Sequence, residues 1–557
     1  MHRRAGLICF AALTSLAAHA AGNLAGAQSL SSADSTARAV DRVFDAWRST
    51  QGPGCAVGVG KNGKVLFERG YGMANLETNT PITPASIFHV ASVSKQFTAM
   101  SIMLLERDGK LSVDDNIRKY VPEIPDYGTP ITIRHLLTHT SGLRDQWNLI
   151  ALARGRFDED RITEADVMDI LPRQTALNFK PGAEYVYSNS GFTLLGVIVK
   201  RVSGKSLREF ADERIFKPLG MTHTHFHDDY TMLVPGRTSA YVPRGNTWAV
   251  SIPNFDVYGA TSLFTTVGDL IKWEANFDAP VIADKSIVAR MEAPTILTNG
   301  DTSSYGFGLV TGQYRGARFV EHNGADAGYR SYAGRFPASG ISIAVLCNAA
   351  TTNTTALARG VADAFLGASL APLEVAVRPQ AAPVSAAAIA RRAGVYVQPT
   401  TLQIVELTVR DGKLHLDRNG PELVPVAENR FRQPNNAFEL TFGAGEHAGF
   451  ERRAVTGGGR PVPFEWKQSV TPTRALLAAY AGRYVSDELG GAVYTVTAND
   501  STIALRTGTE TPDDGRLMFA DTFLALGSTI QFTRTKGVVT GFELTDGRTR
   551  HVKFVRR

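Results

Sequence analysis

The sequence predicts an α+β domain followed by two small all-β domains, and three observations lead to this prediction. Strand-like segments occur near both ends of residues 28–370, with helix-like segments between them. Residues 371–383 are rich in proline and alanine, a composition typical of linkers between domains. Beyond this linker the pattern is almost wholly β and repeats, which predicts one domain at residues 384–470 and another at residues 471–557.

The α+β part is expected to contain one sheet made from both of its ends. Residues 55–72, CAVGVGKNGKVLFERGYG, predict a β-hairpin with its turn at residues 61–64. Near the other end, short strands are predicted at GLVTGQ, RFVEHNG, SYAGRFP and ISIAVLCN, and a helix at residues 355–365. This pattern favours an antiparallel sheet into which a block of helices is inserted.

Two short motifs recur in the C-terminal part of the chain. AGVYV at residues 393–397 returns as AGRYV at residues 481–485, and GFE at residues 449–451 returns at residues 541–543. Each copy begins with a short alanine-rich helical segment. We therefore expect two tandem β-domains, each a closed barrel that protects its edge strands. Their loops carry no obvious chemistry.

The first 27 residues predict a secretory signal peptide. A basic start is followed by the apolar run of residues 5–18, and small residues suited to cleavage precede residues 21 and 28. No later stretch approaches the roughly 18 uninterrupted apolar residues of a membrane-spanning helix. We therefore expect a periplasmic or secreted protein with no membrane span.

Composition narrows the classes of partner. The net charge of +6 is spread over 557 residues without a long run of lysine or arginine, so no nucleic-acid partner is expected. The oligomeric state cannot be read from the sequence. Cys55 and Cys347, both in strand-like runs, would remain after signal cleavage. Their pairing cannot be read either, and we interpret them as two buried small side chains.

The most informative segment is FHVASVSKQFTAMSIM, residues 88–103. Ser92 and Lys95 are three residues apart at the start of a predicted apolar helix, so both side chains lie on one face. A serine hydroxyl becomes a good nucleophile only when a neighbouring group accepts its proton. A desolvated lysine has a lowered pKa and can be that acceptor.

Two later segments supply groups that fit the same chemistry. In YSN, Tyr187 offers a phenol that can shuttle a proton, and Asn189 offers an amide that can hold a substrate. In HNG, His322 can form hydrogen bonds, and Gly324 allows a substrate backbone to come close.

These three motifs, in this order, resemble those of the class C β-lactamase group and its relatives, the penicillin-binding-protein-like D,D-peptidases, D-aminopeptidases and esterases. LLTHTSGL, ADAGYRS and KPLGMTHTHF also look like that family, and the resemblance covers about residues 40–366. It implies a β-lactamase/transpeptidase-like fold with helices flanking an antiparallel sheet. The paired C-terminal domains resemble the lipocalin-like barrels of multidomain D-aminopeptidases.

The resemblance also implies roles for particular residues. Ser92 would be acylated, and Lys95 and Tyr187 would form the base system. The backbone N–H groups of Ser92 and Ala325 would make the oxyanion hole. No cofactor is implied. The expected activity is that of a serine hydrolase acting on D-amino-acid-containing peptides or amides, or on small esters.

Substrate positioning would fall to Asn189, His322, Gly324 and Ala325. His322 stands where many penicillin-recognising enzymes have lysine, and histidine is mostly neutral at pH 7. It would therefore hold a carboxylate less firmly, which makes β-lactam turnover possible but not favoured. No clear equivalent of a deacylating glutamate is found, and Glu184, near Tyr187, is a weak candidate.

Two other functions remain open. In THTHFHDD, His223, His225 and His227 alternate, so that one strand face could present three zinc ligands of a metallohydrolase. The chain could also be a penicillin sensor that is acylated once without turnover.

Overall fold

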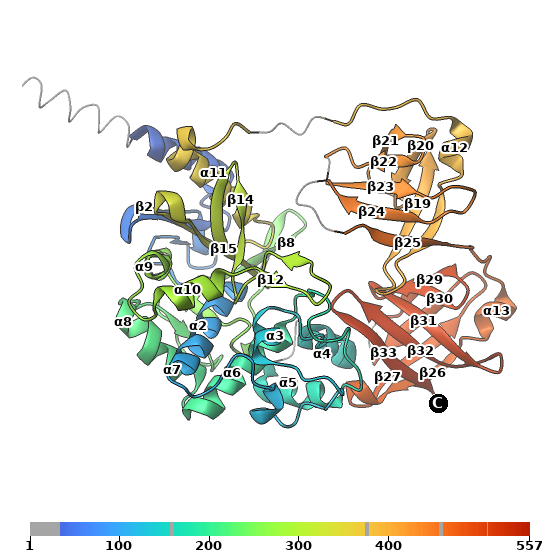
Figure 1. The fold of residues 1–557 in the computed structure, drawn as a ribbon, viewed down its shortest axis with the longest axis horizontal. Helices are drawn as coiled ribbons and strands as arrows, with labels where there is room; N and C mark the ends of the chain where they lie inside the picture. The colour runs from blue at the N-terminus through green and yellow to red at the C-terminus, as the bar shows by residue number, and fades with distance from the viewer. Residues whose placement is uncertain (1–33, 156–160, 374–377, 436, 456–459, 509–510) are drawn as a thin grey trace, which may run out of the picture.

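The computed structural model describes residues 34–155, 161–373, 378–435, 437–455, 460–508 and 511–557, so the predicted signal peptide lies outside it. The described residues up to 373 form an α+β unit. Figure 1 shows two β domains beside it, the second of which lies against its helices. Within the described residues, every helix is too short or too polar to cross a bilayer.

The core of the α+β unit is a six-stranded antiparallel sheet in the order β14-β15-β16-β17-β1-β2. Because β1 pairs with β17, the sheet joins both ends of the unit, and the predicted arrangement is confirmed. The predicted hairpin is also confirmed: Lys61 pairs with Lys64 across a turn in which Asn62 and Gly63 have φ of 49° and 80°. The strands are β14 (Val310–Tyr314), β15 (Ala317–Asp326), β16 (Tyr329–Phe336), β17 (Ile341–Cys347), β1 (Cys55–Lys61) and β2 (Lys64–Tyr71).

Helices cover both faces of this sheet. Alternate residues of β1 point to opposite faces: Ala56 packs in the core that contains α9, and Val57 in the core that contains α11. The inserted block contributes α2 and α6, whose inner residues are fully buried. The helices are α2 (Ser94–Arg107), α3 (Ile133–Leu137), α4 (Gln146–Arg154), α5 (Glu164–Ile170), α6 (Asn189–Ser203), α7 (Leu207–Ala211), α8 (Lys217–Leu219), α9 (Val267–Asp278), α10 (Lys285–Glu292) and α11 (Thr354–Leu366).

Short strands connect these layers. One three-stranded sheet, in the order β5-β11-β7, lies close to the start of α2. Its strands are β5 (Phe88–His89), β11 (Leu263–Thr265) and β7 (His225–Phe226). The other short strands are β3 (Met73–Asn75), β4 (Thr80–Pro81), β6 (Ile162–Thr163), β8 (Tyr241–Arg244), β9 (Thr247–Val250), β10 (Phe255–Asp256), β12 (Thr295–Ile296) and β13 (Thr302–Ser303).

A disulfide bond joins Cys55 to Cys347 across the β1–β17 pair. The two cysteines are directly opposite in register, and their Cα atoms are 4.1 Å apart. Both are buried, as expected, and the disulfide answers the question of pairing that the sequence left open. The pairing depends on a register between segments 292 residues apart, which the local sequence does not reveal.

The C-terminal part forms two eight-stranded β domains, which confirms the all-β prediction. In the second domain the strands β26–β33 close into a barrel. In the first, the end strand β20 is bridged at His415 to Glu422 in the segment before the other end strand, β21, and the Leu423 N–H donates to the Leu414 carbonyl at 2.7 Å. The first domain has α12 (Ala386–Ala390), β18 (Gly394–Val397), β19 (Ile404–Arg410), β20 (Lys413–Leu416), β21 (Val424–Ala427), β22 (Arg430–Arg432), β23 (Phe438–Phe442), β24 (Phe450–Ala454) and β25 (Val462–Lys467). The second has α13 (Arg474–Ala478), β26 (Gly482–Ser486), β27 (Ala492–Ala498), β28 (Ile503–Thr507), β29 (Asp513–Phe519), β30 (Thr522–Ala525), β31 (Ser528–Thr535), β32 (Val538–Asp546) and β33 (Thr549–Arg556).

The repeated motifs occupy equivalent places in the two β domains. The tyrosine of AGVYV donates a hydrogen bond to the carbonyl of Arg392, and its counterpart Tyr484 donates to the carbonyl of Tyr480, in both cases four residues earlier. The GFE motifs lie at the start of β24 and within β32, the seventh strand of each domain. The sequence repeat therefore corresponds to a structural repeat.

Candidate active site

Ser92 lies in a 3-10 turn, Ala91–Val93, directly before α2. The helix begins at Ser94, so Ser92 precedes it rather than forming its first turn. Ala91 has a φ of 46°, an uncommon value for a residue with a side chain. The turn leaves the Ser92 side chain half-buried at the edge of a cavity, while the residues around it are buried.

Lys95 is buried on the first turn of α2, and its amine is directed at the serine. Its Nζ lies 3.1 Å from Ser92 Oγ and also donates to Asn189 Oδ1 at 2.9 Å and to the Ala260 carbonyl at 2.6 Å. Burial lowers the pKa of Lys95 to about 7. A lysine with this pKa is neutral in a large fraction of molecules near neutral pH and can accept a proton.

Asn189 is the first residue of α6, and Asp145 fixes its position. One carboxylate oxygen of Asp145 accepts hydrogen bonds from the Asn189 backbone N–H at 2.7 Å and from its Nδ2 at 2.9 Å. The amide oxygen of Asn189 is therefore turned towards Lys95. Sequence reasoning missed Asp145, although an aspartate before the pattern QWNLIALAR is a signal for a helix N-cap.

Tyr187 lies beside this lysine, just before α6. Its ring centroid is 4.8 Å from Lys95 Nζ and 4.2 Å from the centroid of the buried His139 ring. Burial raises the pKa of the Tyr187 phenol, and the neighbouring Ser92 hydroxyl and Arg548 guanidinium oppose this rise. The phenol is therefore protonated at neutral pH and can donate a hydrogen bond at the cavity.

His322 is buried behind Tyr187. Its Nε2 is 3.0 Å from the hydroxyl of Tyr305, and its ring centroid is 6.3 Å from that of Tyr187. Burial lowers the pKa of His322 to about 3, so the imidazole is neutral. His322 is not among the residues that line the cavity at Ser92. It contacts Tyr305 and Tyr187 instead.

Gly324 and Ala325, on β15, bring the edge of the sheet against Ser92. A Cβ at Gly324 would lie 2.4 Å from the carbonyl oxygen of Val90 and 2.9 Å from the backbone nitrogen of Ser92. Only glycine therefore permits this approach. Ala325 follows at the cavity wall.

These residues surround a cavity of about 440 Å³. One wall is apolar, because Trp147 and Phe255 stack with their ring centroids 4.8 Å apart. The lining residues are Ser92, Trp147, Tyr187, Asn189, Phe255, Thr261, Asn323, Ala325, Asp326 and Arg548. A serine with an adjacent low-pKa amine in a cavity of this size can attack a small carbonyl substrate.

Comparison with protein families agrees with this geometry. The family model described as beta-lactamase matches residues 39–368, more than half of the chain. The chain belongs to the beta-lactamase family.

Two named relatives of this beta-lactamase-family chain are a D-aminopeptidase and a penicillin-binding protein. It is 31% identical over 317 residues to a D-aminopeptidase of Gluconobacter oxydans (strain 621H), a match that covers 56% of this chain and 59% of the relative's own length. It is 29% identical over 415 residues to a penicillin-binding protein of Bacillus subtilis (strain 168), which covers 70% of this chain and 89% of that protein.

Solved structures support the fold. A penicillin-binding protein homologue from Pyrococcus abyssi superposes with a TM-score of 0.54 at 24% identity, covering 75% of this chain and 96% of the other. The D-amino acid amidase from Ochrobactrum anthropi SV3 superposes with a TM-score of 0.51 at 21% identity, covering 60% of this chain and 99% of the amidase. The β-lactamase/transpeptidase-like fold expected from the motifs is therefore confirmed.

Asp326 is a second polar group that sequence reasoning missed in this beta-lactamase-family site. Its carboxylate accepts a hydrogen bond from Thr261 Oγ1 at 2.8 Å and lies 3.2 Å from His89 Nε2. Burial raises the pKa of Asp326 to about 6. The segment ADAG, which follows the predicted HNG motif, was the available signal.

Arg548 reaches the cavity from the second β domain. It lies at the tip of the β32–β33 hairpin, and its guanidinium carbon is 5.0 Å from the centroid of the Tyr187 ring. The predicted glutamate candidate, Glu184, is paired instead with Arg550 of the same hairpin at 3.1 Å. No local sequence signal indicates that this turn lines the Ser92 cavity, because its position depends on how the domains pack.

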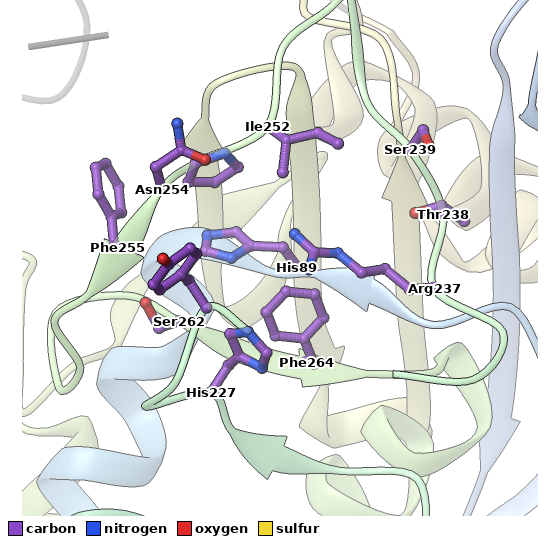
Figure 2. Close-up of a pocket in the computed structure, with 12 residues that line it drawn as sticks. His89, His227, Arg237, Thr238, Ser239, Ile252, Asn254, Phe255, Ser262 and Phe264 are labelled. Atoms are coloured by element: carbon purple, nitrogen blue, oxygen red, sulfur yellow. The ribbon is translucent and has the colours of Figure 1, made fainter. Parts of the chain in front are cut away.

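Of the three histidines in the predicted cluster, His227 lines a neighbouring cavity of about 310 Å³, which shares Phe255 with the Ser92 cavity. Figure 2 shows His89 and His227 facing it beside Phe264 and Arg237. His225 Nε2 and His227 Nδ1 are 3.4 Å apart.

The third histidine, His223, has an exposed side chain whose Nδ1 is 3.2 Å from the Thr222 hydroxyl. Among the residues that the structure describes, no three histidine, cysteine, aspartate or glutamate side chains are grouped so that they could hold a metal ion. The zinc hypothesis therefore gains no support from the geometry.

Proposed function

We propose that this protein is a hydrolase that cleaves amide or ester bonds through an acyl-enzyme on Ser92. The observation that carries the proposal is the 3.1 Å contact between Lys95 Nζ and Ser92 Oγ, made by a buried amine whose pKa is lowered to about 7. A neutral amine at that distance is a general base for the serine hydroxyl.

In the first step, Lys95 accepts the Ser92 proton while Oγ bonds to the substrate carbonyl carbon. The carbonyl π electrons move to oxygen and form a tetrahedral oxyanion. The backbone N–H groups of Ser92 and Ala325 are proposed to stabilise it, and the loss of one such donor costs about 2.7–4 kcal/mol in other enzymes. The close approach that Gly324 permits supports this role for β15.

The second step breaks the bond to the leaving group. Tyr187 passes a proton to the departing nitrogen or oxygen and is reprotonated from Lys95, and the acyl group stays on Ser92. Water then attacks the ester and releases the acid and free serine. Asp326, in the same cavity with a pKa raised to about 6, is a candidate to orient that water.

The other predicted site residues are assigned positioning roles. Asn189 holds Lys95 through its amide oxygen, and it retains one amide hydrogen that can meet a substrate. His322, neutral and bonded to Tyr305, is proposed to support the Tyr187 ring rather than to bind a carboxylate directly.

The substrate class proposed is a small peptide or amide that contains a D-amino acid. The named relatives that support this are a D-aminopeptidase and, at the level of the fold, a D-amino acid amidase. The neutral His322 argues against strong binding of the β-lactam carboxylate at that position, so β-lactam turnover is not favoured. Small esters are proposed as alternative acyl donors.

Export to the periplasm or medium is part of the proposal. The Cys55–Cys347 disulfide suits an oxidising compartment, and residues 1–27 have the pattern of a signal peptide. Cell fractionation together with N-terminal sequencing of the mature protein tests this. An uncleaved N-terminus in a reducing compartment would contradict it.

The activity is tested with D- and L-amino-acid amides, p-nitrophenyl esters and benzylpenicillin, with intact-mass detection of the adduct. Wild type should be acylated, and the adduct should map to Ser92. Ser92→Ala should lose both adduct and turnover. The matched control is Ser101→Ala, which removes a hydroxyl from α2 that donates to the Phe97 carbonyl at 2.9 Å, within the same helix.

Three outcomes distinguish the alternatives. A stoichiometric burst without steady turnover on every substrate would favour the penicillin sensor. Turnover that survives Ser92→Ala would refute the acyl-enzyme. Activity abolished by a chelator and restored by zinc would favour the metallohydrolase.

A further inference from the structure

The tip of the β32–β33 hairpin is held against the α+β unit by its backbone. The Arg548 carbonyl accepts hydrogen bonds from the backbone N–H of Asp145 at 3.1 Å and from Asn178 Nδ2 at 2.8 Å. The Asn178 amide oxygen in turn accepts from the Arg550 backbone N–H at 2.8 Å. Because these contacts do not involve the side chain of Arg548, substitution there preserves them.

Three arginines meet at this junction, and they are used differently. Arg144 and Arg550 are buried and paired with Glu488 and Glu184, at 2.9 Å and 3.1 Å. Arg548 is exposed to the Ser92 cavity, and within the described residues its guanidinium has no carboxylate or carbonyl partner. An unpaired guanidinium presents a fork of donors that matches a carboxylate.

The acidic groups near the cavity are already engaged. Asp145 accepts from Asn189, Asp326 from Thr261, and Asp546 from the amide of Asn148. None of them neutralises Arg548. His322 cannot supply a cation either, because it is buried, neutral and bonded to Tyr305. Among the described residues that line the cavity, Arg548 is thus the one permanent positive charge.

We propose that Arg548 binds the free carboxylate of the substrate's leaving group. The preferred substrate would then be a short peptide whose scissile bond precedes a C-terminal amino acid. The inference rests on the proposed function, in which the Tyr187 hydroxyl protonates the leaving nitrogen. The Arg548 guanidinium lies over the ring of the same Tyr187. In a C-terminal amino acid the carboxylate is one carbon away from the leaving nitrogen, so it would lie on the side of the cavity where Arg548 is.

The test compares N-acetyl-D-Ala-D-Ala with its C-terminal amide, which share a scissile bond and differ only in charge. Assays at about pH 9 keep Lys95, with its pKa of about 7, neutral. The ratio of kcat/KM for acid over amide should fall about 10- to 100-fold in Arg548→Ala. Arg548→Lys should keep part of the preference, and Arg548→Glu should reverse it.

Two controls make the result specific. Arg506→Ala removes an exposed arginine from β28 of the same domain that does not line this cavity, and it should leave the ratio unchanged. N-succinyl and N-acetyl D-Ala amides place the charge on the acyl side instead. Suppose that Arg548→Ala abolished a preference for the N-succinyl over the N-acetyl substrate but left the acid-to-amide ratio of kcat/KM unchanged. Arg548 would then bind a charge on the acyl side, and the assignment to the leaving group would be wrong.

Binding separates this inference from the proposed function. In a Ser92→Ala background, the Kd of the acid should rise about 10- to 100-fold on adding Arg548→Ala, relative to that of the amide. Equal Kd values for acid and amide would overturn the inference even if wild type turns over both. If the Kd values of acid and amide differed in a way that depends on Arg548, but Ser92 were never acylated in wild type, the carboxylate site would be supported and the proposed function refuted.

Discussion

Arg144 and Glu488 form an ion pair between the α+β unit and the second β domain, with 0% and 5% of their side chains exposed. The nitrogen and oxygen are 2.9 Å apart. Glu488 also accepts hydrogen bonds from the Thr175 hydroxyl at 2.6 Å and the Lys553 backbone at 3.0 Å. The junction that brings Arg548 to the active site therefore contains a buried ion pair in which each charge compensates the other.

Removing one member of this pair should destabilise the protein strongly. Arg144→Met leaves the Glu488 carboxylate buried without its cation, a change that costs about 3–5 kcal/mol in other proteins. Chemical denaturation should show this loss, and limited proteolysis should detect release of the second β domain.

The double variant Arg144→Met with Glu488→Met should be more stable than Arg144→Met alone, because no buried charge remains. Arg173→Ala is the control, since it removes an exposed partner of Asp169 and should cost less than about 1 kcal/mol. Equal stability of wild type and Arg144→Met would contradict a structural role for the pair.

The pH dependence of kcat/KM should have an acid limb set by Lys95. The base must be neutral, so activity should rise as pH increases through the Lys95 pKa of about 7. Lys95→Arg keeps a permanent positive charge and should lower kcat/KM about 10²–10⁴-fold across the pH range. A pH-independent rate in wild type between pH 5 and pH 9, as measured with a neutral ester, would remove Lys95 as the base.

Two charges near Lys95 should shift the acid limb of the pH profile of kcat/KM in opposite directions. Asp145 raises the pKa of Lys95 and Arg548 lowers it, although burial is the larger effect. Asp145→Asn should therefore shift the acid limb to lower pH, and Arg548→Ala should shift it to higher pH. Full pH profiles with a neutral ester measure both shifts. Shifts in the same direction would show that rearrangement, rather than charge, dominates.

The disulfide should contribute to stability but not to chemistry. Its cysteines are paired on β1 and β17, and removing such a bond typically costs about 2–4 kcal/mol. Cys55→Ser with Cys347→Ser, or reduction of wild type, should lower the Tm while acylation of Ser92 continues below the transition. An unchanged Tm on reduction would show that the bond does not form in the folded protein in solution.

The sequence predicted those features that depend on local pattern. Asn62-Gly63 between alternating strands specified the hairpin, and the spacing of Ser92 and Lys95 placed both groups at one helix start. Features that depend on docking were missed. Arg548 lies 456 positions after Ser92, in an ordinary Asp-Gly-Arg turn, and only the packing of the second β domain gives it a role.

The same distinction explains the positioning residues. The sequence placed His322 in a motif with Gly324, but it could not show that the imidazole would be buried against Tyr305 while the residues on either side of Gly324, Asn323 and Ala325, face the cavity. Asp145 carried a helix-capping signal, yet its second role in holding Asn189 appears only when α4 and α6 meet. Side-chain direction at a site thus depends on tertiary contacts.

Gly324→Ala should abolish acylation while leaving the fold intact. The added Cβ would lie within 3 Å of the Val90 carbonyl and the Ser92 nitrogen, so β15 would have to move away from the serine turn. That movement would separate the backbone donors of Ser92 and Ala325, and the loss of one oxyanion donor alone costs about 10²–10³ in kcat. The measurement is the rate of Ser92 acylation by a D-amino-acid amide.

Gly268→Ala is the matched control for this substitution. Gly268 lies in α9, where the nearest atom to an added Cβ would be 3.9 Å away, so alanine fits without displacement. Alanine also favours the helix by about 1 kcal/mol. Circular dichroism should show both variants folded. If Gly324→Ala were acylated as fast as Gly268→Ala, the contact between β15 and the Ser92 turn would not position the oxyanion hole, and the proposed role of Ala325 would be wrong.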